Sequence, residues 1–291
     1  MVDTRRAYNI VFVVCHPDDE ALWVGGLIHG LSTFAFLRVF VVCLSGLDPD
    51  SPREAEFHEA RERAGYAGGV VLGGKLRPAT EPLPPTSETT EEGLRCLGLS
   101  RADVDVLITH SPYGDEHTNP HHRQTYQELL RWSREHDVPF GYFTCIPIPL
   151  FMHQPLLRSV KRRAALHLLS FSGCAATPAL TVSEPDYHGA PDYYVQFLTD
   201  METKQRILEC YQSIDLAEHA AGYAAFTSSC ESLYLFGERA LSPFAAVIEE
   251  MEIPGGVADL FPSNGAIPRG PVWSALRRVV PVGIRRAIRN A

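Results

Sequence analysis

Several features are missing from this 291-residue sequence, and each absence argues against a class of protein. No apolar stretch reaches the roughly 20 residues that a membrane-spanning helix needs, and the first residues do not read as a secretory signal. The seven cysteines include no Cys-x-x-Cys pair, and several lie inside apolar runs such as Val41-Val42-Cys43. We therefore expect reduced, buried thiols in a cytoplasmic protein. No Gly-x-Gly-x-x-Gly follows the first apolar run, which argues against a nucleotide-binding Rossmann domain.

Positive charge is also scarce. The formal net charge is −9 and the pI is about 5.7, so a general nucleic-acid binder, which needs a basic face, is not expected. Small anionic substrates held by local arginines remain compatible with this charge. With 45% hydrophobic residues the chain can bury a full core, and its length fits one large α/β domain.

The first half of the chain alternates buried runs with amphipathic segments. Runs rich in β-branched and aromatic residues are typical of strands that are buried on both faces of a parallel sheet. We predict strands over 8–15, 37–44, 69–72, 104–109 and 140–146, and helices over 20–32, 53–67 and 121–136. This order predicts an α/β fold with a Rossmann-like, mostly parallel sheet flanked by helices.

The second half is less regular. We expect strands over 193–198 and 231–236, a helix over 200–213, a basic helix over 156–171, and an exposed loop over 75–90. Residues 1–250 would form one domain and 251–291 a basic C-terminal tail, which has six arginines and no acidic residue after Asp259. Such a tail can form an amphipathic helix on an anionic membrane surface. The alternative is a terminal helix packed on the domain, or a frayed tail.

Two predicted strands end in dense clusters of histidine and carboxylate. The first cluster is His16-Pro17-Asp18-Asp19-Glu20, and the second runs from His110 to His122. In open α/β sheets, function gathers where strands end at their carboxyl edge. Each cluster alone has an ordinary explanation, an acidic helix start or a solvated polar loop. Their joint appearance after two buried strands favours a functional site.

Imidazole, carboxylate and imidazole ligands make a hydrolytic zinc site with one position left for water, and zinc lowers the pKa of that water to about 7. His16 and Asp19 are three residues apart across a turn, so both can face one ion. Asp18 points differently, which suits a general base. His121 or His122 would supply the remaining ligand.

The first cluster resembles the signature of the PIG-L/LmbE-like N-deacetylases, whose second motif is usually His-Pro-Asp-His or His-x-Asn-His. This chain has Asn119-Pro120-His121-His122-Arg123 there. The resemblance implies an LmbE-like fold, with His16, Asp19 and His122 as zinc ligands and Asp18 as the base. Asn119 stands where the family has a histidine that stabilises the oxyanion or protonates the leaving amine. His117 or His121 would then supply the missing imidazole.

The activity implied by the resemblance is metal-dependent hydrolysis of an N-acetyl or other N-acyl amide on an amino sugar or glycoconjugate. Zinc is the expected ion, and Fe²⁺ is the alternative. Arg53, Tyr113 and Arg123 are candidates for binding the substrate, and surface roles are the alternative for both arginines. The competing functions are a metal- or carbohydrate-binding protein of the same fold with weakened catalysis, which the Asn119 departure favours, and a deacylase of a non-sugar amide. The sequence does not fix the substrate or the oligomeric state.

Overall fold

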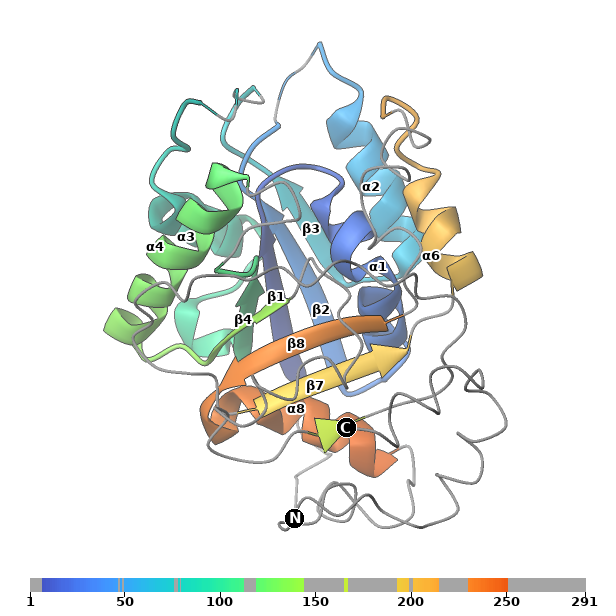
Figure 1. Ribbon diagram of the computed structural model, residues 1–291, viewed down its shortest axis with the longest axis vertical. Helices are drawn as coiled ribbons and strands as arrows, with labels where there is room; N and C mark the ends of the chain where they lie inside the picture. Colours follow the sequence, from blue (N-terminus) through green and yellow to red (C-terminus); the bar gives the residue numbers. More distant parts are fainter. Residues whose placement is uncertain are drawn as a thin grey trace, which may run out of the picture.

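A computed structural model describes residues 7–46, 48, 50–75, 78, 80–112, 119–143, 165–166, 193–198, 201–214 and 230–250. Within these residues the chain forms an eight-stranded sheet in the order β3-β2-β1-β4-β5-β8-β7-β6 (Figure 1). The strands are β1 (Tyr8–Val14), β2 (Leu37–Cys43), β3 (Gly68–Val71), β4 (Val106–Thr109), β5 (Phe140–Phe143), β6 (Ala165–Leu166), β7 (Tyr193–Leu198) and β8 (Cys230–Phe236). The helices are α1 (Asp19–Ser32), α2 (Arg53–Ala64), α3 (Thr86–Cys96), α4 (Pro120–His136), α6 (Met201–Leu208) and α8 (Gly237–Glu250), with a 3₁₀ turn at Arg101–Asp103.

The parallel part of the sheet confirms the predicted fold class. Strands β1 to β5 all run parallel to one another, and β1 pairs with β2 on one side and with β4 on the other. The chain therefore builds outward from β1 through β2 to β3, then returns to the opposite side of β1 for β4. This reversal of strand order is a topological switch point, where open α/β sheets place their ligands.

The far side of the sheet is a different arrangement. β8 runs antiparallel to both β5 and β7, and the short β6 pairs parallel with β7. The sheet is thus mixed, and both of the His-rich clusters identified in the sequence follow strands of its parallel half.

Helices cover both faces of the sheet in three layers (Figure 1). Residues of α1, α2, α6 and α8 share one apolar core with the side chains on one face of the strands, including Leu27, Phe57 and Phe244. α3 and α4 form a second core on the opposite face, around Leu94, Leu129 and Trp132. The two helices that follow β1 and β4, α1 and α4, therefore lie on opposite sides of the switch point.

Helix α1 is kinked, and a buried ion pair supports the kink. Val24 has non-helical angles (φ −139°, ψ 16°), so the half of α1 that follows has its own amino-terminal N–H groups to satisfy. The carboxylate of Glu231 on β8 accepts from the N–H groups of Gly26 and Leu27. Lys204 on α6 lies 2.8 Å from that carboxylate, and both side chains are 1% exposed. A distant strand and helix thus cap the second half of α1.

Two predicted segments differ from the structure. α3 begins at Thr86, inside the segment expected to be a loop, because Glu128 of α4 accepts from both the backbone N–H and the hydroxyl of Thr86. Ala165–Leu166, inside the segment expected to be a basic helix, form the strand β6 that pairs with β7. The predicted tail at 251–291 lies outside the described residues.

Five of the seven cysteines fall within the described residues, and four of these, Cys15, Cys43, Cys96 and Cys210, are free thiols. Cys15, Cys43 and Cys210 are buried, as expected, whereas Cys96 is exposed. Among the helices of the described residues, none is both long enough and apolar enough to span a bilayer.

Candidate metal centre

The two His-rich clusters meet at the switch point between β1 and β4. His16 follows β1, and Asp19 opens α1 directly beyond it. His122 lies in the first turn of α4, which follows β4. The sheet order places these chain segments side by side, as the sequence analysis required.

Three donor atoms from these segments form a nearly equilateral triangle. His16 Nδ1 lies 3.4 Å from Asp19 Oδ2, His122 Nε2 lies 3.4 Å from the same oxygen, and the two ring nitrogens are 3.4 Å apart. The carboxylate is 5% exposed and His122 2%, whereas His16 is 17% exposed. Water therefore reaches the triangle from the side of His16.

This triangle fits a tetrahedral divalent ion. Zinc binds histidine nitrogen and carboxylate oxygen at about 2.0–2.2 Å, and a tetrahedron with bonds of about 2.1 Å has edges of about 3.4 Å. Two imidazole nitrogens and one carboxylate oxygen are also ligands that suit zinc and iron. The residues present fit a divalent ion that would be held by three protein ligands.

The neighbours of Asp19 keep it ionised and oriented. Its Oδ2 accepts from the backbone N–H of His16 at 2.8 Å, and its Oδ1 accepts from the indole N–H of Trp23 at 3.2 Å. Burial alone would raise the pKa of Asp19, but the neighbouring imidazoles, that of His122 first, outweigh burial and hold that pKa well below its usual range. A carboxylate in this state is ready to bind a cation.

His110 lies behind the triangle and was not assigned a role from the sequence. It is fully buried, and its ring stacks on that of His122 with centroids 3.9 Å apart and planes 7° apart. Its Nε2 accepts from the backbone N–H of Cys15 at 3.0 Å. Burial lowers the pKa of His110 to about 4, so the ring is neutral at physiological pH. A neutral flat ring of this kind fixes the plane of His122.

A second donor set overlaps the triangle. Cys15, Asp19, His110 and His122 place one donor atom each within 4.8 Å of one another, and all four residues are buried. In this set, however, the lone pair of His110 Nε2 already accepts the Cys15 N–H, and the Cys15 sulfur lies 3.0 Å from the Thr125 hydroxyl. The three atoms of the triangle are also closer together, so His16, Asp19 and His122 are the better ligand set.

Asp18 lies next to the triangle in a strained conformation. Its φ of 136° is outside the regions that L-residues favour, a strain of the kind that collects at functional sites. Its Oδ2 lies 2.7 Å from the guanidinium of Arg53, which also donates to the carbonyl of Pro17 at 3.0 Å. Burial, and then the charge of Asp19, raise the pKa of Asp18, although Arg53 opposes them. Arg53, predicted from sequence as a substrate ligand, therefore contacts the candidate base.

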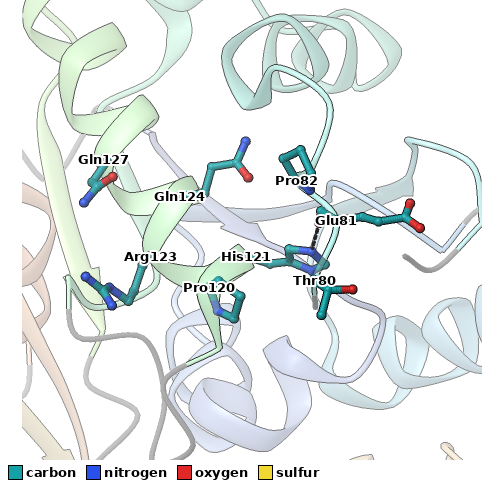
Figure 2. A pocket seen from close by; sticks show the side chains of 8 residues that line it. All are labelled: Thr80, Glu81, Pro82, Pro120, His121, Arg123, Gln124 and Gln127. Carbon is teal, nitrogen blue, oxygen red and sulfur yellow. Dashed lines mark hydrogen bonds between the residues drawn. The ribbon is translucent and has the colours of Figure 1, made fainter. Parts of the chain in front are cut away.

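His121 lies on the other side of His16. Its Nδ1 is 3.2 Å from His16 Nε2, and its Nε2 is 2.6 Å from the carbonyl oxygen of Glu81. The side chain is buried, and burial lowers the pKa of His121. His121 also lines a cleft of about 380 Å³ between α4 and the segment before α3 (Figure 2). The residues of this cleft are mostly polar: Thr80, Glu81, Pro82, Pro120, His121, Arg123, Gln124 and Gln127.

The remaining predicted site residues lie around α4 or outside the described chain. Asn119 is the N-cap of α4, and its side-chain oxygen accepts from the backbone N–H of His121 at 3.0 Å. Arg123 is exposed and lines the cleft. Tyr113 and His117 belong to residues 113–118, which lie outside the described residues.

A carboxyl group that the sequence analysis did not assign lies beneath the site. Glu20 is 1% exposed, accepts from the backbone N–H of Asp18 at 3.2 Å, and is hydrogen-bonded to the hydroxyl of Tyr211. Burial raises the pKa of Glu20 to about 8. Only its place in the Asp18-Asp19-Glu20 run marked it in the sequence. His110 and Cys15 gave similar signals, because each directly follows a predicted strand or ends it.

Comparisons with known proteins find solved structures of distant similarity, several of which are named as deacetylases. No protein-family model matches the chain, and no curated protein matches it. A solved teicoplanin-pathway deacetylase is 16% identical, with 78% of this chain and 97% of that chain covered and a TM-score of 0.46. The A40926 pseudoaglycone deacetylase is 17% identical (78% and 96% covered, TM-score 0.47). The N,N′-diacetylchitobiose deacetylase from Pyrococcus horikoshii is also 17% identical (80% and 85% covered, TM-score 0.45). Similarity this distant leaves the chemistry to be argued from the site itself.

Proposed function

We propose that this protein is a metal-dependent hydrolase that removes an acetyl or similar acyl group from the amide of an amino sugar or glycoconjugate. One observation carries this assignment: the triangle of His16 Nδ1, Asp19 Oδ2 and His122 Nε2, whose three edges are all 3.4 Å. A divalent ion bound there, zinc in the first instance, acts as a Lewis acid and makes a water molecule nucleophilic at neutral pH.

Asp18 is the proposed general base. It is adjacent in sequence to a ligand of the triangle, and its side chain is not one of the three donors. Its carboxylate would take the proton of the attacking water and return it to the amide nitrogen, so that the amine leaves. Arg53, at 2.7 Å, holds the carboxylate in place and limits how far its pKa rises. General bases of this kind contribute about 10²–10⁴ in rate.

Asn119 would donate a hydrogen bond to the oxyanion that forms during attack. Its side-chain oxygen caps α4, so the donating group would be its amide nitrogen. An asparagine cannot carry a proton at neutral pH, which leaves the proton transfer to Asp18 or to His117. One donor to an oxyanion is worth about 10²–10³ in rate.

The cleft beside His121 supports a hydroxyl-rich substrate. The side chains of Thr80, Arg123 and Gln127 line it and offer hydrogen-bond donors to hydroxyl or anionic groups. The neighbours named above are called deacetylases of teicoplanin biosynthesis, of A40926 pseudoaglycone and of N,N′-diacetylchitobiose. An amino-sugar substrate agrees with the polar cleft of this protein. A protein of this fold that binds metal or carbohydrate without turnover is the second candidate, because Asn119 replaces the imidazole that the sequence resemblance implies.

Amine release distinguishes these candidates. The zinc-loaded protein would be assayed with N-acetylglucosamine, N,N′-diacetylchitobiose, an N-acetylglucosamine conjugate, and N-acetyl amino acids as non-sugar amides. We expect turnover of at least one sugar substrate, and Asp18→Asn should lose about 10²–10⁴ in kcat while binding zinc as tightly as the wild type. The control is His29→Ala, which should keep full activity. It removes an imidazole near the end of α1 that is hydrogen-bonded to the Ala64 carbonyl of α2. A zinc-loaded wild type that releases no amine from the panel would favour the binding protein.

A further inference from the structure

His16 and His121 form a hydrogen-bonded chain that ends at a backbone carbonyl. His121 Nε2 lies 2.6 Å from the Glu81 oxygen, and His121 Nδ1 lies 3.2 Å from His16 Nε2. Figure 2 shows the His121 ring directed at Glu81, with the hydrogen bond drawn between them. His121 is 1% exposed, so water has little access to its ring.

The direction of these hydrogen bonds follows from the carbonyl. A carbonyl oxygen only accepts, so the proton of a neutral His121 ring lies on Nε2 and its Nδ1 is an acceptor. His16 Nε2 must then be the donor, which leaves the lone pair of its ring on Nδ1. That nitrogen is the one that faces Asp19 Oδ2 and His122 Nε2 at 3.4 Å.

We propose that His121 is a positioning residue, which fixes the tautomer and ring orientation of His16 so that its Nδ1 points at the metal. This inference rests on the proposed function, since it assigns a task to His121 within the same centre. Histidine ligands commonly donate their second N–H to a carboxylate or a carbonyl, and removal of such a partner weakens metal binding about 10–100-fold. In this protein a second imidazole spans the gap between His16 and the carbonyl.

The segment that carries the Glu81 carbonyl is anchored to α4 two residues further on, at Leu83. The side-chain amide of Gln124 accepts from the Leu83 N–H at 3.0 Å and donates to the Leu83 carbonyl at 3.2 Å. Gln124 also donates to Glu128 at 2.9 Å, and Glu128 accepts from Thr86 at the start of α3. One helix therefore presents His121 and anchors the segment that His121 contacts.

This arrangement gives His121 a different task from the one the sequence offered. Both ring nitrogens are engaged, one as a donor to Glu81 and one as an acceptor from His16. A ring in this state has no nitrogen left to protonate a leaving amine. The acid role considered for His121 therefore passes to other groups, and His121 acts through His16.

A matched pair of variants tests the relay. Asparagine and leucine have the same branched shape, but only asparagine can accept from His16 at the position of the original Nδ1. Zinc affinity would be measured by competition with a chromogenic chelator for the wild type, His121→Asn, His121→Leu and the control His29→Ala. We expect His121→Leu to bind zinc about 10–100-fold more weakly, His121→Asn to recover most of that loss, and His29→Ala to match the wild type.

Nitrogen-15 NMR of the zinc-free proteins gives a readout that does not depend on metal. We expect His16 to be protonated at Nε2 alone in the wild type and in His121→Asn, and to exchange between both tautomers in His121→Leu. Equal zinc affinity and an unchanged His16 signal in His121→Leu would overturn the inference, and so would equal weakening by leucine and asparagine. A wild type that binds no zinc would instead overturn the proposed function, while the NMR measurement would still decide the hydrogen-bonded chain.

Discussion

Helix α1 has charged groups at both of its halves, and the two groups differ in exposure and partners. At its start, Asp19 supplies one corner of the donor triangle and Asp18 lies next to it, and the His16 side chain of the triangle is 17% exposed. At its kink, Glu231 and Lys204 form an ion pair that is 1% exposed, and the carboxylate caps backbone N–H groups. The donor atoms of the triangle can still bind a ligand, whereas the Glu231 carboxylate is already occupied by Lys204 and the backbone N–H groups. A cluster of charged groups that is buried and fully paired is therefore structural, whereas one that is partly exposed and incompletely paired is a candidate site.

Mutations in the donor triangle beside the start of α1 should reduce metal binding and activity more than any other change. Replacing His122 by alanine removes one corner of the triangle and the ring that His110 stacks on. We expect zinc binding to weaken by more than the 10–100-fold that follows loss of a supporting partner, and amide hydrolysis to fall with it. Isothermal titration with zinc and an amine-release assay would measure both. Retention of wild-type affinity in His122→Ala would remove this residue from the metal centre.

Mutation of the buried ion pair at the kink of α1 should lower the stability of the protein and leave metal binding unchanged. Lys204→Met leaves the buried Glu231 carboxylate without its cation, a change that costs about 3–5 kcal/mol. Arg239 and Asp137 provide a matched control, because they are also 2.8 Å apart but their side chains are 65% and 91% exposed. Arg239→Met should cost under about 1 kcal/mol. Urea unfolding of both variants measures the difference, and similar losses in the two would contradict a capping role for the buried pair.

A pH-dependent effect on stability is expected from Glu20, which lies in the first turn of α1. Its pKa is raised from 4.5 to about 8 by burial, so the folded protein keeps a proton that the unfolded chain releases above about pH 4.5. The free energy of unfolding therefore falls as pH rises through this window, by about 1.4 kcal/mol for each pH unit. Glu20→Gln mimics the protonated form and can still bond to Tyr211.

We expect the stability advantage of Glu20→Gln over the wild type to be near zero at pH 4.5, to grow as the pH rises, and to level off above about pH 8. Urea unfolding of the zinc-free proteins across this range measures it, with Tyr211→Phe as the comparison that removes only the hydroxyl. Parallel stability curves for the wild type and Glu20→Gln would show that Glu20 is ionised in the folded protein.

The parallel half of the fold was predictable because its signals are local. The β-branched runs that became β1, β2 and β4 are each buried on both faces, and the turn of Asp18 and Asp19 begins a helix directly after one of them. The rule that parallel strands end at one edge of a sheet brought His16 and Asp19 together with the His121-His122 pair, and the choice of His122 came from the family resemblance.

The parts that were not predicted depend on contacts between distant segments. α3 begins at Thr86 because Glu128, 42 residues away, satisfies its first N–H. β6 is a strand because β7 pairs with it, although its surroundings in sequence suggested a helix. The stacking of His110 on His122 and the pairing of Lys204 with Glu231 likewise join residues that no local pattern relates.

X-ray absorption spectroscopy of the zinc-loaded protein would identify the atoms that bind the ion. The triangle predicts only nitrogen and oxygen ligands, from His16, Asp19, His122 and solvent, at about 2.0–2.2 Å. A sulfur ligand at about 2.3 Å would show that the ion sits instead among Cys15, His110 and their neighbours, and would contradict the account.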